Sequence, residues 1–135
     1  MKNENKKERL NSISNGVDKV VIGNWKMNPN TKEEGTVLVK EIEKGIETIN
    51  EPDIVVAPPF LFLSSVKDNL SKIKLGAQNV YGNSGGAHTG EVSIEELKNI
   101  GVEYVIVGHS ERRKDGETDE EIARKVKVVI NSDLT

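Results

Sequence analysis

The sequence predicts an α/β protein built from about four successive strand-helix units. Short apolar runs rich in β-branched residues alternate along the chain with amphipathic stretches whose apolar residues recur at helical spacing. Three of those stretches open with a Ser or Thr that is followed three residues later by a Glu, a pattern typical of helix N-termini. These capping patterns fall at residues 31–34, 93–96 and 118–121.

The first two units are read from residues 20–70. The apolar run at 20–22 predicts a strand, and the capping pattern at 31–34 then starts a helix. Its predicted apolar face consists of Leu38, Ile42, Ile46 and Ile49. A second strand is predicted at 54–57, after which two prolines turn the chain into another helix. The face of that helix is marked by Phe62, Leu63, Val66 and Leu70.

The third and fourth units follow the same order. A short strand at 73–77 leads into a glycine-rich loop at 82–90 and a helix that begins at Ser93 and ends at Gly101. The fourth strand is predicted at 104–107. Its helix starts with the last capping pattern, and the predicted apolar face is Ile122, Val126, Val129 and Ile130.

The exit of the fourth strand is the first candidate site. An apolar run of this kind is typical of a strand buried on both faces of a parallel sheet, and it stops abruptly before His109. In α/β proteins ligands meet the residues that follow the carboxyl ends of strands. His109 is therefore placed to act on a small molecule, although a histidine at a strand end is, taken by itself, more often structural.

Composition narrows the function classes. The 135 residues are 35% hydrophobic and 30% charged, which fits one ordinary domain. A net charge of −3 argues against a nucleic-acid or anionic-membrane surface, and no apolar run approaches the ~18 residues that span a bilayer. The absence of cysteine excludes disulfides and thiolate metal sites. We expect a cytoplasmic, metal-free protein with a polar, disordered tail at 1–18 and one domain at 19–135.

Four segments then narrow the fold and the function. They are GNWKMN at 23–28, GAQN at 76–79, GAHTGE at 86–91 and GHSERR at 108–113. In this order and spacing they resemble the signatures of the triosephosphate isomerase family, and the resemblance covers the chain from residue 19 to its end. It implies the N-terminal half of a (β/α)8 TIM barrel. It also implies a cofactor-free homodimeric isomerase that interconverts dihydroxyacetone phosphate and glyceraldehyde 3-phosphate in glycolysis and gluconeogenesis.

The resemblance assigns roles to four residues at strand exits. His109 would be the catalytic electrophile, and triosephosphate isomerase is itself the standard example of a histidine kept neutral by a helix N-terminus. Lys26 would bind substrate and stabilise the enediolate oxygen electrostatically, whereas a lysine of unknown context is more often a surface residue. Asn24 would bind substrate and orient the lysine. Glu111 would pair with Lys26 or relay protons, where otherwise it is an ordinary first-turn acid.

The resemblance also implies a dimer loop and shows departures from the family. Thr89 would cross into the neighbouring subunit from the loop at 80–89, which without the resemblance is equally consistent with an ordinary surface loop. His88 stands where the family has an aromatic residue. The segment after Arg113 is one residue short and lacks its usual apolar residue.

The largest departure from the family is that this sequence offers no candidate for the general base. The family's catalytic glutamate follows the sixth strand, and no carboxylate of this sequence stands in such a motif. Three interpretations remain open. The chain is the truncated N-terminal half of an isomerase that is inactive alone, or a non-catalytic half-barrel that serves as a phosphate-binding or assembly module. The third is a different (β/α)8 or flavodoxin-like enzyme.

Overall fold

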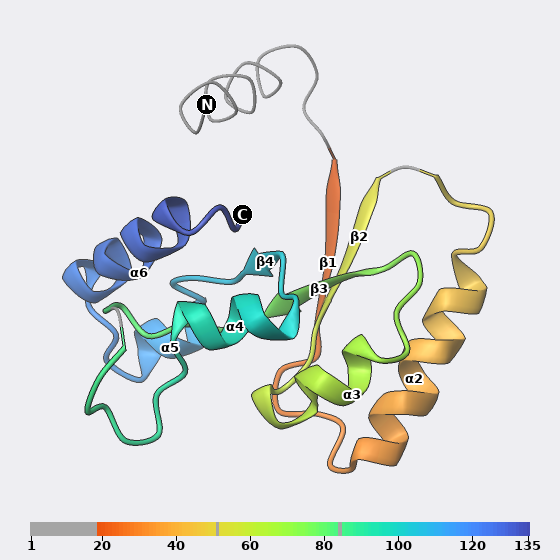
Figure 1. Ribbon diagram of the computed structural model, residues 1–135, viewed down its shortest axis with the longest axis horizontal. Helices are drawn as coiled ribbons and strands as arrows, with labels where there is room; N and C mark the ends of the chain where they lie inside the picture. The colour runs from red at the N-terminus through yellow and green to blue at the C-terminus, as the bar shows by residue number, and fades with distance from the viewer. Residues whose placement is uncertain (1–18, 51, 84) are drawn as a thin grey trace.

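The computed structural model describes residues 19–50, 52–83 and 85–135, so the tail predicted at 1–18 lies outside the described residues. Four parallel strands lie side by side in sequence order and curl into half of a (β/α)8 barrel (Figure 1), which confirms the predicted fold class. The elements are β1 (Val20–Asn24), α2 (Lys32–Gly45), β2 (Asp53–Ala57), the 3₁₀ helix η1 (Phe60–Phe62), α3 (Leu63–Lys67), β3 (Lys74–Ala77), α4 (Ile94–Ile100), β4 (Tyr104–Val105), α5 (Ser110–Lys114) and α6 (Asp119–Asn131).

The register of the sheet brings the carboxyl ends of the strands to one edge. β1 and β2 pair over five positions, from Val20 opposite Asp53 to Asn24 opposite Ala57. β3 then pairs with β2 and β4, again in parallel. Because parallel neighbours run in one direction, the loops after β1, β3 and β4 all leave from this edge. The candidate site was predicted at this edge.

An apolar core fills the space between the sheet and its helices. Its largest fully buried side chains come from α2, α3, β3, α4 and the loop after β3, and they are Leu63, Leu75, Leu97, Val39, Val66 and Val80. Among the described helices, none is both long and apolar enough to cross a membrane.

The first helix begins where it was predicted and ends earlier. The Thr31 hydroxyl accepts the Glu34 amide hydrogen at 3.2 Å, while the Glu34 carboxylate accepts the amide of Asn30 rather than that of Thr31. α2 ends at Gly45, so the prediction that Ile49 extends its apolar face was wrong.

The apolar face of α2 is also turned from the predicted one. Val39 is fully buried, whereas Leu38, which was predicted to be on the buried face, is 37% exposed. Ile42 and Ile46 do pack on the core. Because residues 39, 42 and 46 follow the three-and-four spacing of one helix face, the chain buries that stripe.

The second helix is shorter than predicted. Its residues form the 3₁₀ helix η1 followed by five residues of α3. The Asn69 side chain donates to the Ser65 carbonyl at 2.7 Å. A side-chain donor on a helix carbonyl replaces the next backbone amide, so the helix ends there. Leu63 and Val66 are nevertheless buried as predicted.

The last two capping boxes are confirmed. Ser93 and Thr118 each accept the amide of a glutamate three residues later, whose carboxylate returns to the cap amide. Gly101 ends α4 with a φ of +90°, which glycine adopts without strain. On α6, however, Val126 is 40% and Ile130 57% exposed, because the described residues place no element over that side.

β4 corrects the prediction of a four-residue strand buried on both faces. It spans two residues, and residues 104–107 are all half-buried, because β4 lies at the side of the sheet. Its outer edge carries one further backbone pairing. Thr135 donates to the Glu103 carbonyl at 3.0 Å and accepts the Val105 amide at 2.9 Å, the bond pattern of a parallel bridge.

The outer edge of β1 is the open side of the described sheet. Val20, Val21 and Ile22 are 39%, 55% and 45% exposed, and the described residues place no strand beside them. The opposite side of the sheet, along β4, is partly covered by Thr135.

A polar cluster joins the amino ends of three strands, away from the candidate site. The Asp53 carboxylate accepts hydrogen bonds from Lys74 at 2.5 Å and from the Tyr104 hydroxyl at 2.9 Å. These two hydrogen bonds lower the pKa of Asp53 below its ordinary value. The cluster therefore connects the first residues of β2, β3 and β4.

Candidate active site

A pocket of about 140 Å³ lies at the carboxyl edge of the sheet. It collects side chains that follow β1, β2, β3 and β4, so residues far apart in the sequence meet there. The residues that line it are Asn24, Lys26, Phe60, Gln78, Asn79, His109, Glu111 and Arg112. The structure thus brings together four of the five predicted site residues, and Thr89 does not line this pocket.

The backbone of Lys26 is held from both sides. Its φ is +55°, in the left-handed region that non-glycine residues rarely adopt. Its amide donates to Oδ1 of Asn24 at 2.9 Å, and its carbonyl accepts from Nε2 of Gln78 at 2.7 Å. Gln78 also donates to the Ala57 carbonyl at 2.8 Å, so both hydrogens of its amide group are used. Strained backbone persists only when its surroundings fix it, and here the side chains of Asn24 and Gln78 do so.

The side chain of Lys26 reaches Glu111 across the pocket. Its ammonium lies 2.5 Å from Oε1 of Glu111, and both side chains are about half exposed, at 53%. The hydrogen bond from Lys26 lowers the pKa of Glu111 below its ordinary value. Since exposed ion pairs contribute little to stability, the main effect of this pair is to fix where the ammonium lies.

The imidazole of His109 is oriented by the helix that it caps. His109 is the N-cap of α5, and its Nδ1 accepts the Glu111 amide hydrogen at 3.2 Å. A ring nitrogen that accepts a hydrogen bond carries no proton, so this geometry fits a neutral imidazole with its hydrogen on Nε2. Oε2 of Glu111 is 3.6 Å from the same Nδ1. Because the Nδ1 lone pair already accepts the closer Glu111 amide hydrogen, the amide determines the tautomer.

Gly108 sets the path of the chain into His109. Its φ is +68°, and a Cβ at this position would lie 3.2 Å from two side-chain carbons of Ile122. Glycine is therefore required both by the backbone conformation and by the close approach of α6. The strand exit can turn sharply only with this residue.

The loop between β3 and α4 projects from the body of the molecule (Figure 1). Thr89 is exposed on this loop. His88 lies against Tyr81, with its Nδ1 3.0 Å from the tyrosine oxygen and the ring centroids 4.5 Å apart. The departure at His88 is thus accommodated inside the loop by a neighbouring aromatic residue.

Two properties limit what the described site can do. Glu111 is the single carboxylate among the described residues that line the pocket, and Lys26 occupies it. No group of three or more His, Asp or Glu residues that could hold a metal ion occurs in the described ranges. The arrangement supplies a cation and a neutral hydrogen-bond donor, both suited to an oxygen that gains negative charge.

Comparison with known proteins decides the family. The family model for triosephosphate isomerase matches residues 19–135, which is most of the chain. The chain belongs to the triosephosphate isomerase family. A triosephosphate isomerase of Alkaliphilus oremlandii is 48% identical over 118 residues, covering 85% of this chain and 47% of that protein. Those of Alkaliphilus metalliredigens and Endomicrobium trichonymphae are 45% and 42% identical, and each is also covered over 47% of its length.

The chain spans about half the length of the curated triosephosphate isomerases that it matches. Two residues of this half-length site were not predicted. Gln78 lies within the GAQN segment at 76–79, and its side chain fixes the backbone of Lys26. Arg112 lies within the GHSERR segment but was not among the predicted site residues, yet it lines the pocket. A polar residue directly after a buried strand is the signal that would have pointed to Gln78.

Proposed function

We propose that this chain supplies the electrophilic half of a triosephosphate isomerase active site. The observation that carries the proposal is the meeting of Lys26, His109 and Glu111 in one pocket at the carboxyl edge of the sheet. The substrate is a phosphorylated triose, in which a proton moves between adjacent carbons through an enediolate. The rate then depends on how well the site stabilises the negative charge that develops on the enediolate oxygen.

Each residue contributes one function to that step. The Lys26 ammonium provides positive charge beside the oxygen, and Glu111 keeps it in the pocket. His109 donates its Nε2 hydrogen to the same oxygen while Nδ1 is held by the Glu111 amide. Asn24 uses Oδ1 to hold Lys26, which leaves its amide hydrogens to donate to substrate.

The general base is proposed to come from residues outside this chain. The carboxylate in the described pocket is paired with Lys26, which disfavours its taking a proton from carbon. The proposal therefore predicts little or no turnover by the 135-residue chain alone. We also propose that the protein acts in glycolysis and gluconeogenesis in the cytoplasm, which the family supports. The same proposal includes a homodimer in which Thr89 enters the partner subunit, and the exposed position of Thr89 supports it.

The test joins the chain to the half of a relative that the chain does not match. The 135 residues are fused to the unmatched C-terminal half of the Alkaliphilus oremlandii relative, and isomerisation of dihydroxyacetone phosphate is measured. We expect activity that falls by about 10²–10³-fold in His109→Gln and in Lys26→Met, because each removes a group that stabilises the oxyanion. Lys98→Met, on the exposed side of α4, is the matched control and should retain activity.

Two results would contradict the proposal. A folded fusion protein that is no more active than its His109→Gln variant would exclude the assigned role of the histidine. Turnover by the 135-residue chain at the level of the fusion would show that the base lies within this chain. The second result would favour another carboxylate of the chain over a base in the other half.

A further inference from the structure

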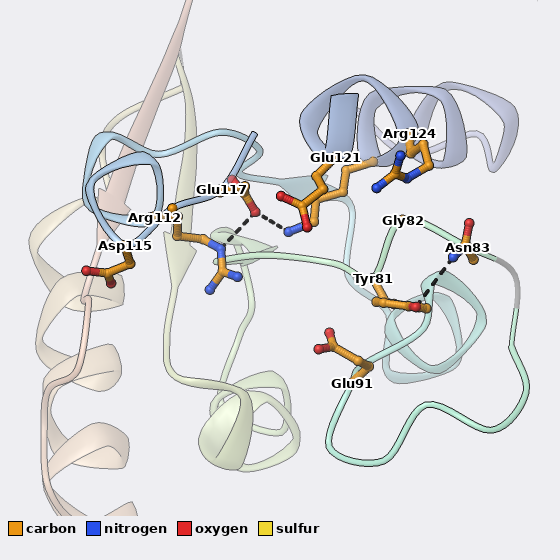
Figure 2. A pocket seen from close by; sticks show the side chains of 11 residues that line it. Tyr81, Gly82, Asn83, Glu91, Arg112, Asp115, Glu117, Glu121 and Arg124 are labelled. Carbon is orange, nitrogen blue, oxygen red and sulfur yellow. Dashed lines mark hydrogen bonds and ion pairs between the residues drawn. The ribbon is translucent and has the colours of Figure 1, made fainter. Parts of the chain in front are cut away.

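A second cavity, of about 340 Å³, lies beside the candidate active site and between α5, α6 and the loop after β3 (Figure 2). Arg112 lines both cavities and so separates them. Figure 2 shows Glu117 with a dashed contact to Arg112. The same Glu117 carboxylate also pairs with Lys125, and both of these side chains are buried. Neither residue has a part in the proposed chemistry.

Glu117 and Lys125 form the centre of a four-residue network. The Lys125 ammonium donates to the Glu117 carboxylate and, at 2.9 Å, to Oδ1 of Asn79. Arg112 donates its Nε hydrogen to the same carboxylate oxygen at 3.1 Å. The side chains of Glu117 and Lys125 are 5% and 9% exposed. The network thus runs from the exit of β3, through α6 and the segment after α5, into α5 itself.

Both ends of this network reach the candidate active site. Asn79 and Arg112 each line the pocket that contains Lys26 and His109. Arg112 also lies in α5, next to Glu111 and three residues after His109. Any movement of the Arg112 side chain relative to β3 is therefore coupled to the short helix that His109 caps.

Stability alone is a poor explanation of the buried pair. Charges lose their hydration on burial, and replacing such a pair with neutral groups of similar size is often harmless to stability. Burial acts to raise the pKa of Glu117, but the hydrogen bonds from Lys125 and Arg112 outweigh it and lower that pKa. In addition, Oε2 of Glu117 is buried and accepts no hydrogen bond from the described residues. Burying these charges costs free energy of desolvation. In return, the contacts fix the relative positions of β3, α5 and α6.

We propose that Glu117 and Lys125 are positioning residues, whose buried contact holds Arg112 and α5 at a set distance from β3 and thereby aligns His109 and Glu111 with Lys26. The proposal rests on the proposed function for the meaning of that alignment. The alignment itself is measurable without substrate.

The experiment records the ring ¹⁵N signals of His109 and the backbone amide signals of residues 26 and 109–112 in the 135-residue chain. Glu117→Gln keeps the size of the side chain and removes its charge, and we expect it to shift these signals. Glu120→Gln, exposed on the first turn of α6, is the matched control and should leave them in place. The urea midpoint of each variant is measured in parallel.

A double variant, Glu117→Gln with Lys125→Met, removes both charges and guards against unfolding of the single variant. The same displacement of the His109 signals in a folded double variant supports positioning. Folded variants whose His109 and Glu111 signals coincide with those of the wild type overturn it. Unfolding of both variants also overturns it, since the pair would then act through stability. If the signals shift but the fusion protein is inactive, the proposed function fails and the positioning role stands.

Discussion

The amide nitrogen of Glu111 lies 3.2 Å from Nδ1 of His109, so the first turn of α5 fixes the tautomer of the histidine that caps it. One backbone hydrogen therefore decides which ring nitrogen can donate into the pocket. The same glutamate holds the Lys26 ammonium through its side chain. Glu111 thus fixes both the imidazole of His109, through its backbone amide, and the ammonium of Lys26, through its carboxylate.

The tautomer can be observed directly. At about pH 8.5, where an ordinary imidazole is neutral, we expect His109 to carry its hydrogen on Nε2. Long-range ¹H–¹⁵N spectra of the ring distinguish the two tautomers. His88, whose Nδ1 faces the Tyr81 hydroxyl, serves as the internal comparison. A spectrum with the hydrogen of His109 on Nδ1 would contradict the assignment.

Replacing Gln78 should loosen Lys26 and weaken the fold. Gln78→Met removes two hydrogen bonds to the carbonyls of Lys26 and Ala57, each contributing about 0.5–1.5 kcal/mol. We expect a loss of roughly 1–3 kcal/mol in urea unfolding. Gln78→Glu has nearly the same shape but no donor when ionised, so it should be at least as destabilising near neutral pH. A fully stable Gln78→Glu protein would rule out the donor role.

The two capping boxes give a prediction about stability alone. Ser93→Ala and Thr118→Ala should each cost about 1 kcal/mol, because each leaves a first-turn amide of α4 or α6 without its acceptor. Ser64→Ala, at an exposed position of α3, is the matched control and should change the unfolding free energy by only a few tenths of a kcal/mol. Equal effects at all three positions would argue against capping.

Acid stability should depend on Asp53. Its pKa is lower in the folded protein than its ordinary value, so its contribution is present above the unfolded-state pKa and is lost as the pH falls through the folded-state pKa. Asp53→Asn should therefore lower stability at pH 7 by about 1 kcal/mol or less, since the Lys74 pair is more than one-third exposed. The difference from wild type should shrink below about pH 4. Urea titrations at the two pH values measure it, and a difference that grows in acid would refute it.

Short-range sequence patterns predicted the helix N-termini and the order of the strands. The capping boxes at Ser93 and Thr118 were found because a cap side chain and its carboxylate are one helical turn apart in the sequence. The strand order followed from the alternation of apolar runs and amphipathic stretches. The proximity of Lys26 and Glu111 required the family resemblance as well, since 85 residues separate them.

Long-range contacts and the surroundings of the sheet decided the rest. Gln78 acts on a carbonyl 52 residues away, and Lys125 on an asparagine 46 residues away, so no spacing rule could reveal either contact. The exposure of Val126 and Ile130 depends on what covers α6, which an amphipathic pattern does not specify. The early end of α2 depended on where the chain had to turn toward β2.

The sequential strand order has a consequence for how the molecule assembles. Each strand pairs with the one that precedes it along the chain, so every βα unit can dock on a template that has already emerged from the ribosome. Contacts between successive units keep the loop-closure entropy of each step small. Folding can therefore proceed during synthesis from β1 toward β4, and the site around His109 is completed last.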